Sequence, residues 1–218
     1  MSDAFGEHVA HRYSLEAVRN LIRRKLFKEN PRSFAWGDIT SVSSILQYML
    51  ACDIPIVSSL GYCPHFHVQY DEPLIVSSGL ISCGTEHADS LQSRLDSFES
   101  VSRRTCNVCN DNLVRWYKFI NDAFLLAFEI SPNRKIILDH VLRVVINEND
   151  CITYHLRGVI YHGNNHFTCR VVSPLELVWF HDGLVTGSTM VLDGNLSSQI
   201  DLYTCREKSA TVAVYLRL

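Results

Sequence analysis

A histidine and an aspartate sixteen residues apart could together form the base of a hydrolytic site. His166 comes after the β-prone segment 152–161 and the turn sequence Gly163-Asn164-Asn165, so we expect it at the start of a returning strand. Asp182 follows the next apolar segments, and a hairpin register could place its carboxylate beside His166. Such a carboxylate accepts a hydrogen bond from one imidazole nitrogen, fixes the tautomer and stabilises the imidazolium. The pair is the base-and-orienter half of a cysteine-protease triad.

The residues around this pair resemble the histidine box of the ubiquitin-specific proteases, a family of deubiquitinases with a papain-like fold. The matching positions are Tyr154, Leu156, Val159, Ile160, His162, Gly163, His166, Phe167, Trp179 and Asp182. The segment Ala213–Arg217 is also similar to the family's last palm strand. The resemblance implies an α+β, papain-like cysteine peptidase fold. It also implies ubiquitin or a ubiquitinated protein as the partner.

A second segment is similar to the family's cysteine box but lacks the cysteine. Gly37 and Ser44–Gln47 match that box without a gap, which puts Thr40 at the nucleophile position and Ala35 at the oxyanion asparagine position. A threonine hydroxyl is far less acidic than a thiol, and losing an oxyanion donor typically costs about 10²- to 10³-fold in rate. Cys52 lies about 18 Å further along a helix, too far to substitute.

These departures favour a binding domain whose catalysis is lost or severely weakened, with ubiquitin or a scaffold protein as its ligand. The alternative is an active deubiquitinase with an unusual hydroxyl nucleophile or a misaligned cysteine box. A further alternative is a zinc-stabilised structural adaptor. Thr40 also has a purely structural interpretation, because threonine is a good helix N-cap.

Four metal-ligating residues lie between the two boxes: Cys83, His87, Cys106 and Cys109. Three thiolates and one imidazole suit a tetrahedral structural zinc site. The family often carries zinc ligands in this region, in the fingers that grip ubiquitin. The alternatives are a redox pair or plain buried thiols, although a redox pair usually belongs to a thioredoxin-like βαβ unit. A neighbouring cluster, Cys63, His65 and His67, is interpreted as structural, with metal binding as its alternative.

The elements expected to position these residues change in type along the chain. Apolar periodicity predicts helices over 14–29, 40–51 and 89–102, and Asn30-Pro31 ends the first. Residues 53–70 look irregular or extended. Strands are predicted over 123–130, 141–146, 152–161, 167–172, 178–181 and 210–218. Helices followed by an antiparallel sheet favour an α+β fold.

The resemblance divides a single domain, 1–218, into three parts. Residues 1–60 would form a helical thumb-like part, 61–120 a reduced finger region with the zinc site, and 121–218 the β palm with the histidine box. The finger and thumb regions look short for the family, so the grip on ubiquitin is expected to be incomplete.

Composition excludes some classes of function. The formal charge of −3 argues against a nucleic-acid partner, which requires a basic surface. Arg23, Arg24, Lys25 and Lys28 cluster locally, and the ordinary interpretation is a solvated helix face. A secretory signal and an apolar stretch long enough to span a bilayer are both absent from the sequence, so no membrane partner is expected. We therefore expect an intracellular protein, in cytoplasm or nucleus, with reduced cysteines.

Overall fold

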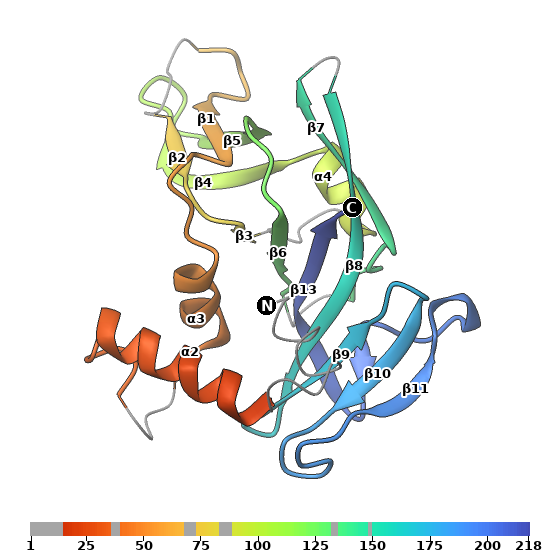
Figure 1. Cartoon of the computed structure of the whole chain (residues 1–218). Helices are drawn as coiled ribbons and strands as arrows, with labels where there is room; N and C mark the ends of the chain where they lie inside the picture. The colour runs from red at the N-terminus through yellow and green to blue at the C-terminus, as the bar shows by residue number, and fades with distance from the viewer. Residues whose placement is uncertain (1–14, 36–39, 68–72, 83–88, 132–134, 148–149) are drawn as a thin grey trace.

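The computed structural model describes residues 15–35, 40–67, 73–82, 89–131, 135–147 and 150–218 (Figure 1). It is an α+β structure dominated by a large and a small sheet, with α2 and α3 beside them (Figure 1). The predicted α+β class is therefore confirmed, while the finer papain-like assignment stays a prediction. No helix in these ranges is both long and apolar enough to cross a bilayer.

Two of the described helices come first in the chain, and a third follows the first three strands. Helix α2 spans Leu15–Glu29 and ends before Pro31, as predicted. Helix α3 spans Val42–Met49, and its N-cap is Ser41, whose hydroxyl accepts a 3.0 Å hydrogen bond from the backbone N–H of Ser44. The interpretation of Thr40 as this N-cap is therefore wrong by one residue. Helix α4 spans Leu91–Asp96 and begins with a capping box between Ser90 and Ser93.

The large sheet contains the segments predicted as strands in the second half of the chain. Its main path runs β11-β10-β9-β8-β13-β6-β3, with β7 paired to β8 and β12 to β13. The strands are β3 (Leu80–Ser82), β6 (Leu125–Glu129), β7 (Val141–Asn147), β8 (Asp150–Gly163), β9 (His166–Val172), β10 (Leu177–His181), β11 (Val191–Asn195), β12 (Thr204–Cys205) and β13 (Lys208–Arg217). A 3₁₀ turn, η1 (Leu196–Ser198), follows β11.

The small sheet has the order β2-β1-β5-β4. Its strands are β1 (Val57–Tyr62), β2 (Leu74–Val76), β4 (Glu99–Thr105) and β5 (Asn112–Phe119). The segment 53–70, expected to be irregular or extended, contains the extended strand β1. The helix predicted over 89–102 is corrected, because α4 ends at Asp96. The chain turns into β4 because Glu99 pairs with Trp116 of β5, and Phe98 is buried against Tyr117 and Phe119.

The core joins the two sheets. Apolar side chains from β1 and β5, such as Val57 and Phe119, belong to the same buried cluster as Leu126 and Phe128 of β6. Helix α3 packs separately on the large sheet, where Leu46 meets Ala127 and Val212. Leu46 is the fully buried residue of α3, and Val42, together with Leu50 after the helix, is partly buried against the same cluster.

Buried tyrosines attach the irregular segments to the large sheet. Tyr154, Tyr161 and Tyr215 are fully buried, and each hydroxyl donates to a backbone carbonyl. The acceptors are Ala123 at 2.8 Å, Leu202 at 2.9 Å and Asp139 at 2.7 Å, respectively. A buried tyrosine hydroxyl needs such a partner, so these bonds select one position for each segment.

The edge strand β7 receives hydrogen bonds from a side chain of α4. The Gln92 amide donates to the carbonyl of Arg143 at 3.1 Å and accepts from the backbone N–H of Arg143 at 2.7 Å. The backbone N–H of Gln92 donates to Asp139 at 2.8 Å. Helix α4 is therefore fixed against this edge by directed bonds.

Candidate functional site

The hairpin β8–β9 positions His166 where the sequence placed it. Gly163 pairs with His166 across a two-residue turn, Asn164-Asn165. Both asparagines have positive φ, 53° and 55°, as a type I′ hairpin turn requires. Strand β10 runs antiparallel to β9 and ends at His181, so Asp182 returns beside the start of β9. The imidazole Nε2 of His166 lies 2.8 Å from Oδ1 of Asp182.

Asp182 is held as a buried carboxylate. Its side chain also accepts hydrogen bonds from the backbone N–H groups of Leu184 at 2.9 Å and Val185 at 3.3 Å. The hydrogen bond with His166, followed by these two N–H groups, holds the pKa of Asp182 below its ordinary value despite burial. This contact can orient the His166 ring and fix its tautomer, while the catalytic role of the pair stays a prediction.

The expected nucleophile position contains no partner for this pair within the described residues. The Thr40 hydroxyl donates to the carbonyl of Ser33 at 2.9 Å, and Ala35 is partly buried beside this segment. The neighbouring Ser41 hydroxyl caps α3. Among the described side chains, only Asp182 hydrogen-bonds to His166. Residues 36–39, which complete the segment similar to a cysteine box, lie outside the described ranges.

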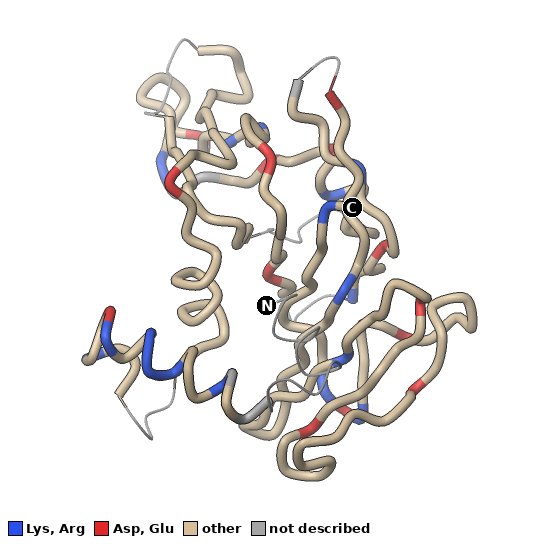
Figure 2. Tube along the Cα trace, in the orientation of Figure 1, with Lys and Arg blue, Asp and Glu red and all other residues tan. Residues whose placement is uncertain are grey.

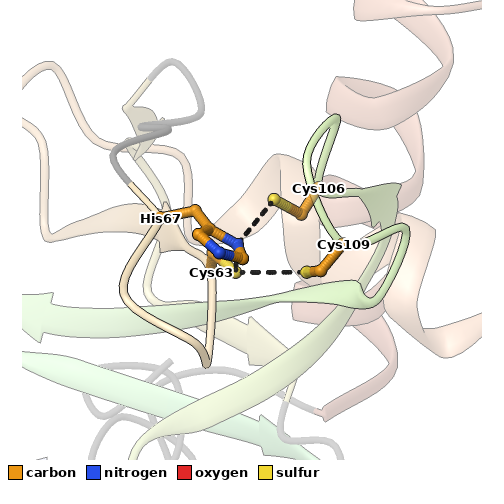
Figure 3. Close-up of side chains that lie close together, drawn as sticks. All are labelled: Cys63, His67, Cys106 and Cys109. Carbon is orange, nitrogen blue, oxygen red and sulfur yellow. Dashed lines mark hydrogen bonds between the residues drawn. The ribbon is translucent and has the colours of Figure 1, made fainter.

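A cluster of metal-ligating side chains lies at the tip of the small sheet. Cys63 and His67 follow β1, whereas Cys106 and Cys109 belong to the turn between β4 and β5 (Figure 3). The four ligand atoms all lie within 4.8 Å of one another. Pairing of Tyr62 with Val114 brings the two segments together. Cys63 and Cys106 are almost completely buried, and the local apolar cluster otherwise consists of Leu113 with Cys109 packed against it.

The separations fit a tetrahedral zinc site. Tetrahedral bonds of the usual zinc lengths give ligand–ligand separations of about 3.8 Å for two sulfurs and about 3.6 Å for sulfur and nitrogen. The observed values are 3.6 Å between the Cys63 and Cys109 sulfurs, 3.4 Å between Cys63 Sγ and His67 Nδ1, and 3.6 Å between Cys106 Sγ and His67 Nδ1. The donor set and its spacing therefore both suit a single tetrahedral ion.

Backbone N–H groups stabilise the thiolate form of Cys106. The N–H groups of Cys109 and then Val108 point at the Cys106 sulfur and lower the pKa of Cys106 to about 6. The N–H of Asp111 acts to lower the pKa of Cys109, but burial and the adjacent Cys63 and Cys106 thiols outweigh it and raise that pKa to about 11. Cys106 is thus prepared to bind an ion as a thiolate, whereas binding would displace the proton of Cys109.

Outer contacts hold the two ligand segments in place. The N–H of His65 points at the Cys63 sulfur at 3.4 Å, and the N–H of Val108 points at the Cys106 sulfur at the same distance. His65 Nε2 also lies 2.7 Å from Oδ2 of Asp111, which joins the two segments across the cluster. Contacts of this kind orient metal ligands in proteins.

The structure groups different residues from those that the sequence singled out. Cys106 and Cys109 lie in the cluster, while Cys83 and His87 lie outside the described residues. The other two positions are filled by Cys63 and His67, which had been interpreted as structural. Their Cys-x₃-His spacing is identical to that of Cys83 and His87, so local sequence could not decide between them. The deciding signal is the pairing of β1 with β5, a contact far apart in sequence.

Comparison with known proteins gives a likeness in structure alone. No protein-family model matches the sequence, and no curated protein is similar to it in sequence. A chain of the yeast SAGA DUB module with a mutant Sgf73 is similar with a TM-score of 0.51 and 14% identity, covering 93% of this chain and 49% of that one. A chain of the SAGA Ubp8/Sgf11/Sus1/Sgf73 DUB module bound to ubiquitin aldehyde is similar with a TM-score of 0.50 and 13% identity. That match covers 93% of this chain and 48% of the other chain.

These similarities concern the fold. This chain spans about half the length of the chains that it matches. The identity is too low to transfer any residue's role. The fold is therefore a mixed, mainly β structure that is distantly similar to chains of DUB-module structures.

Proposed function

We propose that this chain is a degenerate ubiquitin-specific-protease-like domain that binds ubiquitin or a scaffold partner without efficient cleavage. Support comes from three sources: the residues resembling the histidine box, the distant likeness to DUB-module chains, and the contact of His166 with Asp182. The particular observation behind the loss of catalysis is the Thr40 hydroxyl. It donates its hydrogen bond to the backbone carbonyl of Ser33, so it makes no hydrogen bond through which His166 could activate it.

The pair His166–Asp182 would then serve as a remnant of a catalytic base. A general base acts only on a group within hydrogen-bond reach or through one water. The Thr40 hydroxyl is weakly acidic and already hydrogen-bonds to a backbone carbonyl, so it is a poor nucleophile. Alanine at the expected oxyanion position has no side-chain donor for the developing negative charge. The buried, hydrogen-bonded Asp182 keeps the hairpin rigid whether or not the chain catalyses a reaction.

The cysteine cluster would hold a structural zinc ion. Cys63, His67, Cys106 and Cys109 would be its ligands, in a closed site of four protein groups that leaves no position for a reacting water. The ion would join the end of β1 to the β4–β5 turn and stabilise the tip of the small sheet. The role of the site is then to keep this surface ordered for a partner.

The activity assay uses ubiquitin with a fluorogenic amide at its C-terminus. We expect no release of the fluorophore above background, and the same result for His166→Ala. Release by the natural chain that disappears in His166→Ala would overturn the proposed loss of catalysis. It would instead support the active deubiquitinase alternative, which the intact His166–Asp182 contact favours.

The binding assay uses immobilised ubiquitin. Binding that persists in His166→Ala supports a ligand site independent of the remnant base. Absence of ubiquitin binding by the natural chain would remove ubiquitin as the partner.

Restoring the two missing groups tests the alignment of the cysteine box. The double variant Ala35→Asn with Thr40→Cys should be labelled by a ubiquitin probe that carries a C-terminal electrophile. Ala35→Asn with Ser43→Cys, which instead places a partly buried thiol in the first turn of α3, is the matched control. Equal labelling of both variants would show that Thr40 does not occupy the nucleophile position.

A further inference from the structure

Helix α2 carries a concentrated positive charge on a protein that is otherwise acidic (Figure 2). Its cations are Arg19, Arg23, Arg24, Lys25 and Lys28, with no acidic residue between the first and the last. The chain has 20 basic and 23 acidic residues, so the part outside these five has 15 basic and 23 acidic residues, a formal charge of −8. The charge of α2 therefore contrasts with that of the remaining chain.

One face of this helix is both cationic and turned outward. Leu21, Arg24, Lys25 and Lys28 have the spacing i, i+3, i+4 and i+7, which places them on one side of a helix. All four are exposed, and Leu21 is 68% exposed. The opposite side contains Leu26, which is buried. The described residues form no ion pair or hydrogen bond with Arg24, Lys25 or Lys28 side chains.

We propose that this outer face of α2 (Leu21, Arg24, Lys25 and Lys28) docks an acidic amphipathic segment of a partner protein. Three cations around one exposed leucine match carboxylates placed around an apolar side chain. Arginine and lysine both pair with carboxylates, and the arginine can do so with two parallel hydrogen bonds. The inference is independent of the proposed function, because it uses neither the histidine pair nor the cysteine cluster.

The size of the face favours a short protein segment over a nucleic acid. The four residues span about 11 Å along the helix axis at 1.5 Å per residue. A long polyanion would extend beyond this face to the rest of the chain, which carries the charge of −8. Repulsion there acts over about 8 Å at physiological salt. An acidic segment of two or three helical turns stays within the cationic face.

The placement of the apolar residues disfavours a membrane surface. The large exposed apolar side chains of α2 are Leu21 and Phe27. Six residues apart at 100° each, they point about 120° away from one another around the helix. An interfacial helix needs its apolar residues on one face so that they enter the acyl layer together. Leu21 can instead contact a single apolar side chain of a bound peptide.

Fluorescence anisotropy with the labelled acidic peptide Glu-Glu-Leu-Glu-Glu-Leu-Leu-Glu-Glu-Leu-Glu, about three helical turns long, tests the proposal. The test variant of the full chain is Lys25→Glu with Lys28→Glu. The control variant, Lys118→Glu with Arg143→Glu, has the same change in charge. Its two residues are exposed and lie outside α2. We expect the test variant to lose at least about tenfold in affinity and the control to change less than about twofold. Leu21→Ser should also weaken binding, and binding should fall steeply between about 50 and 300 mM salt.

Three results would overturn the proposal: no binding of the peptide by the natural chain, equal losses in test and control variants, or no effect of Leu21→Ser. A short DNA duplex and vesicles with anionic lipid are titrated in parallel. Tighter binding of either than of the peptide would also overturn it, since the proposed ligand is a protein segment. The altered residues are exposed, and a melting curve for each variant confirms that the fold persists.

Discussion

If the cysteine cluster holds the proposed zinc ion, removal of that ion should loosen the tip of the small sheet while the large sheet stays folded. The buried residues at this tip are Cys63, Cys106 and Leu113, so few apolar contacts would remain without an ion. An ion present at about a thousand times its dissociation constant stabilises the bound form by about 4 kcal/mol. Amides that exchange when the tip opens should therefore exchange up to about a thousandfold faster after the ion is removed.

Hydrogen exchange measured by mass spectrometry separates local from global opening. With chelator, we expect faster exchange in β1 and β5, which meet at Tyr62 and Val114, and unchanged exchange in β8 and β13. Cys106→Ser should reproduce the chelator result. The control is Cys151→Ser, because Cys151 is an exposed thiol on β8 outside the cluster. Elemental analysis should find about one zinc per chain.

Two results would refute the reasoning about the metal. One is that purified protein contains no bound metal and the backbone amides of β1 and β5 are nevertheless protected from hydrogen exchange. The other is Cys106→Ser that changes exchange no more than Cys151→Ser does. Either would mean that strand pairing alone orders the tip and that the close thiols are plain buried side chains.

Three further outcomes follow from single positions. Leu46→Ala, which empties the contact of α3 with Ala127 and Val212, should cost about 2–5 kcal/mol in chemical denaturation, and a cost near zero would contradict this packing. Asp182 has a lowered folded pKa, so its contribution is present above about pH 4 and is lost as the pH falls through the folded value. The stability difference between the natural chain and Asp182→Asn should therefore shrink on acidification, and a constant difference in denaturant titrations would argue against the His166 contact. Asn164→Val should destabilise by about 1–2 kcal/mol because φ is 53°, whereas a neutral result would exclude this turn.

The histidine hairpin was predictable because its determinants are local. The turn sequence Gly163-Asn164-Asn165 fixes the register of β8 and β9, and the next strand returns Asp182 to His166. The α+β class was predictable from local periodicity as well, although strands β1 to β3 lie between α3 and α4. The catalytic role of the pair stays a prediction, as does the division into thumb, finger and palm.

The metal cluster was only half predictable because its determinants are distant in sequence. The C-x-x-C spacing of Cys106 and Cys109 indicates metal ligands in the sequence alone. Cys63 comes close to them only through the pairing of β1 with β5. The predicted end of helix α4 was wrong for a related reason. Leu91, Leu95 and Phe98 satisfy helical spacing, yet Phe98 packs against the aromatic rings of β5 and draws the chain into a strand.

The bond pattern of Gln92 has a consequence for how this protein behaves at high concentration. An edge strand exposes backbone donors and acceptors to which a strand of another molecule can add. The Gln92 side chain takes both backbone groups of Arg143, in the middle of β7, as a neighbouring strand would. A change of Gln92 to leucine would leave this edge open, and two molecules would then tend to pair through β7.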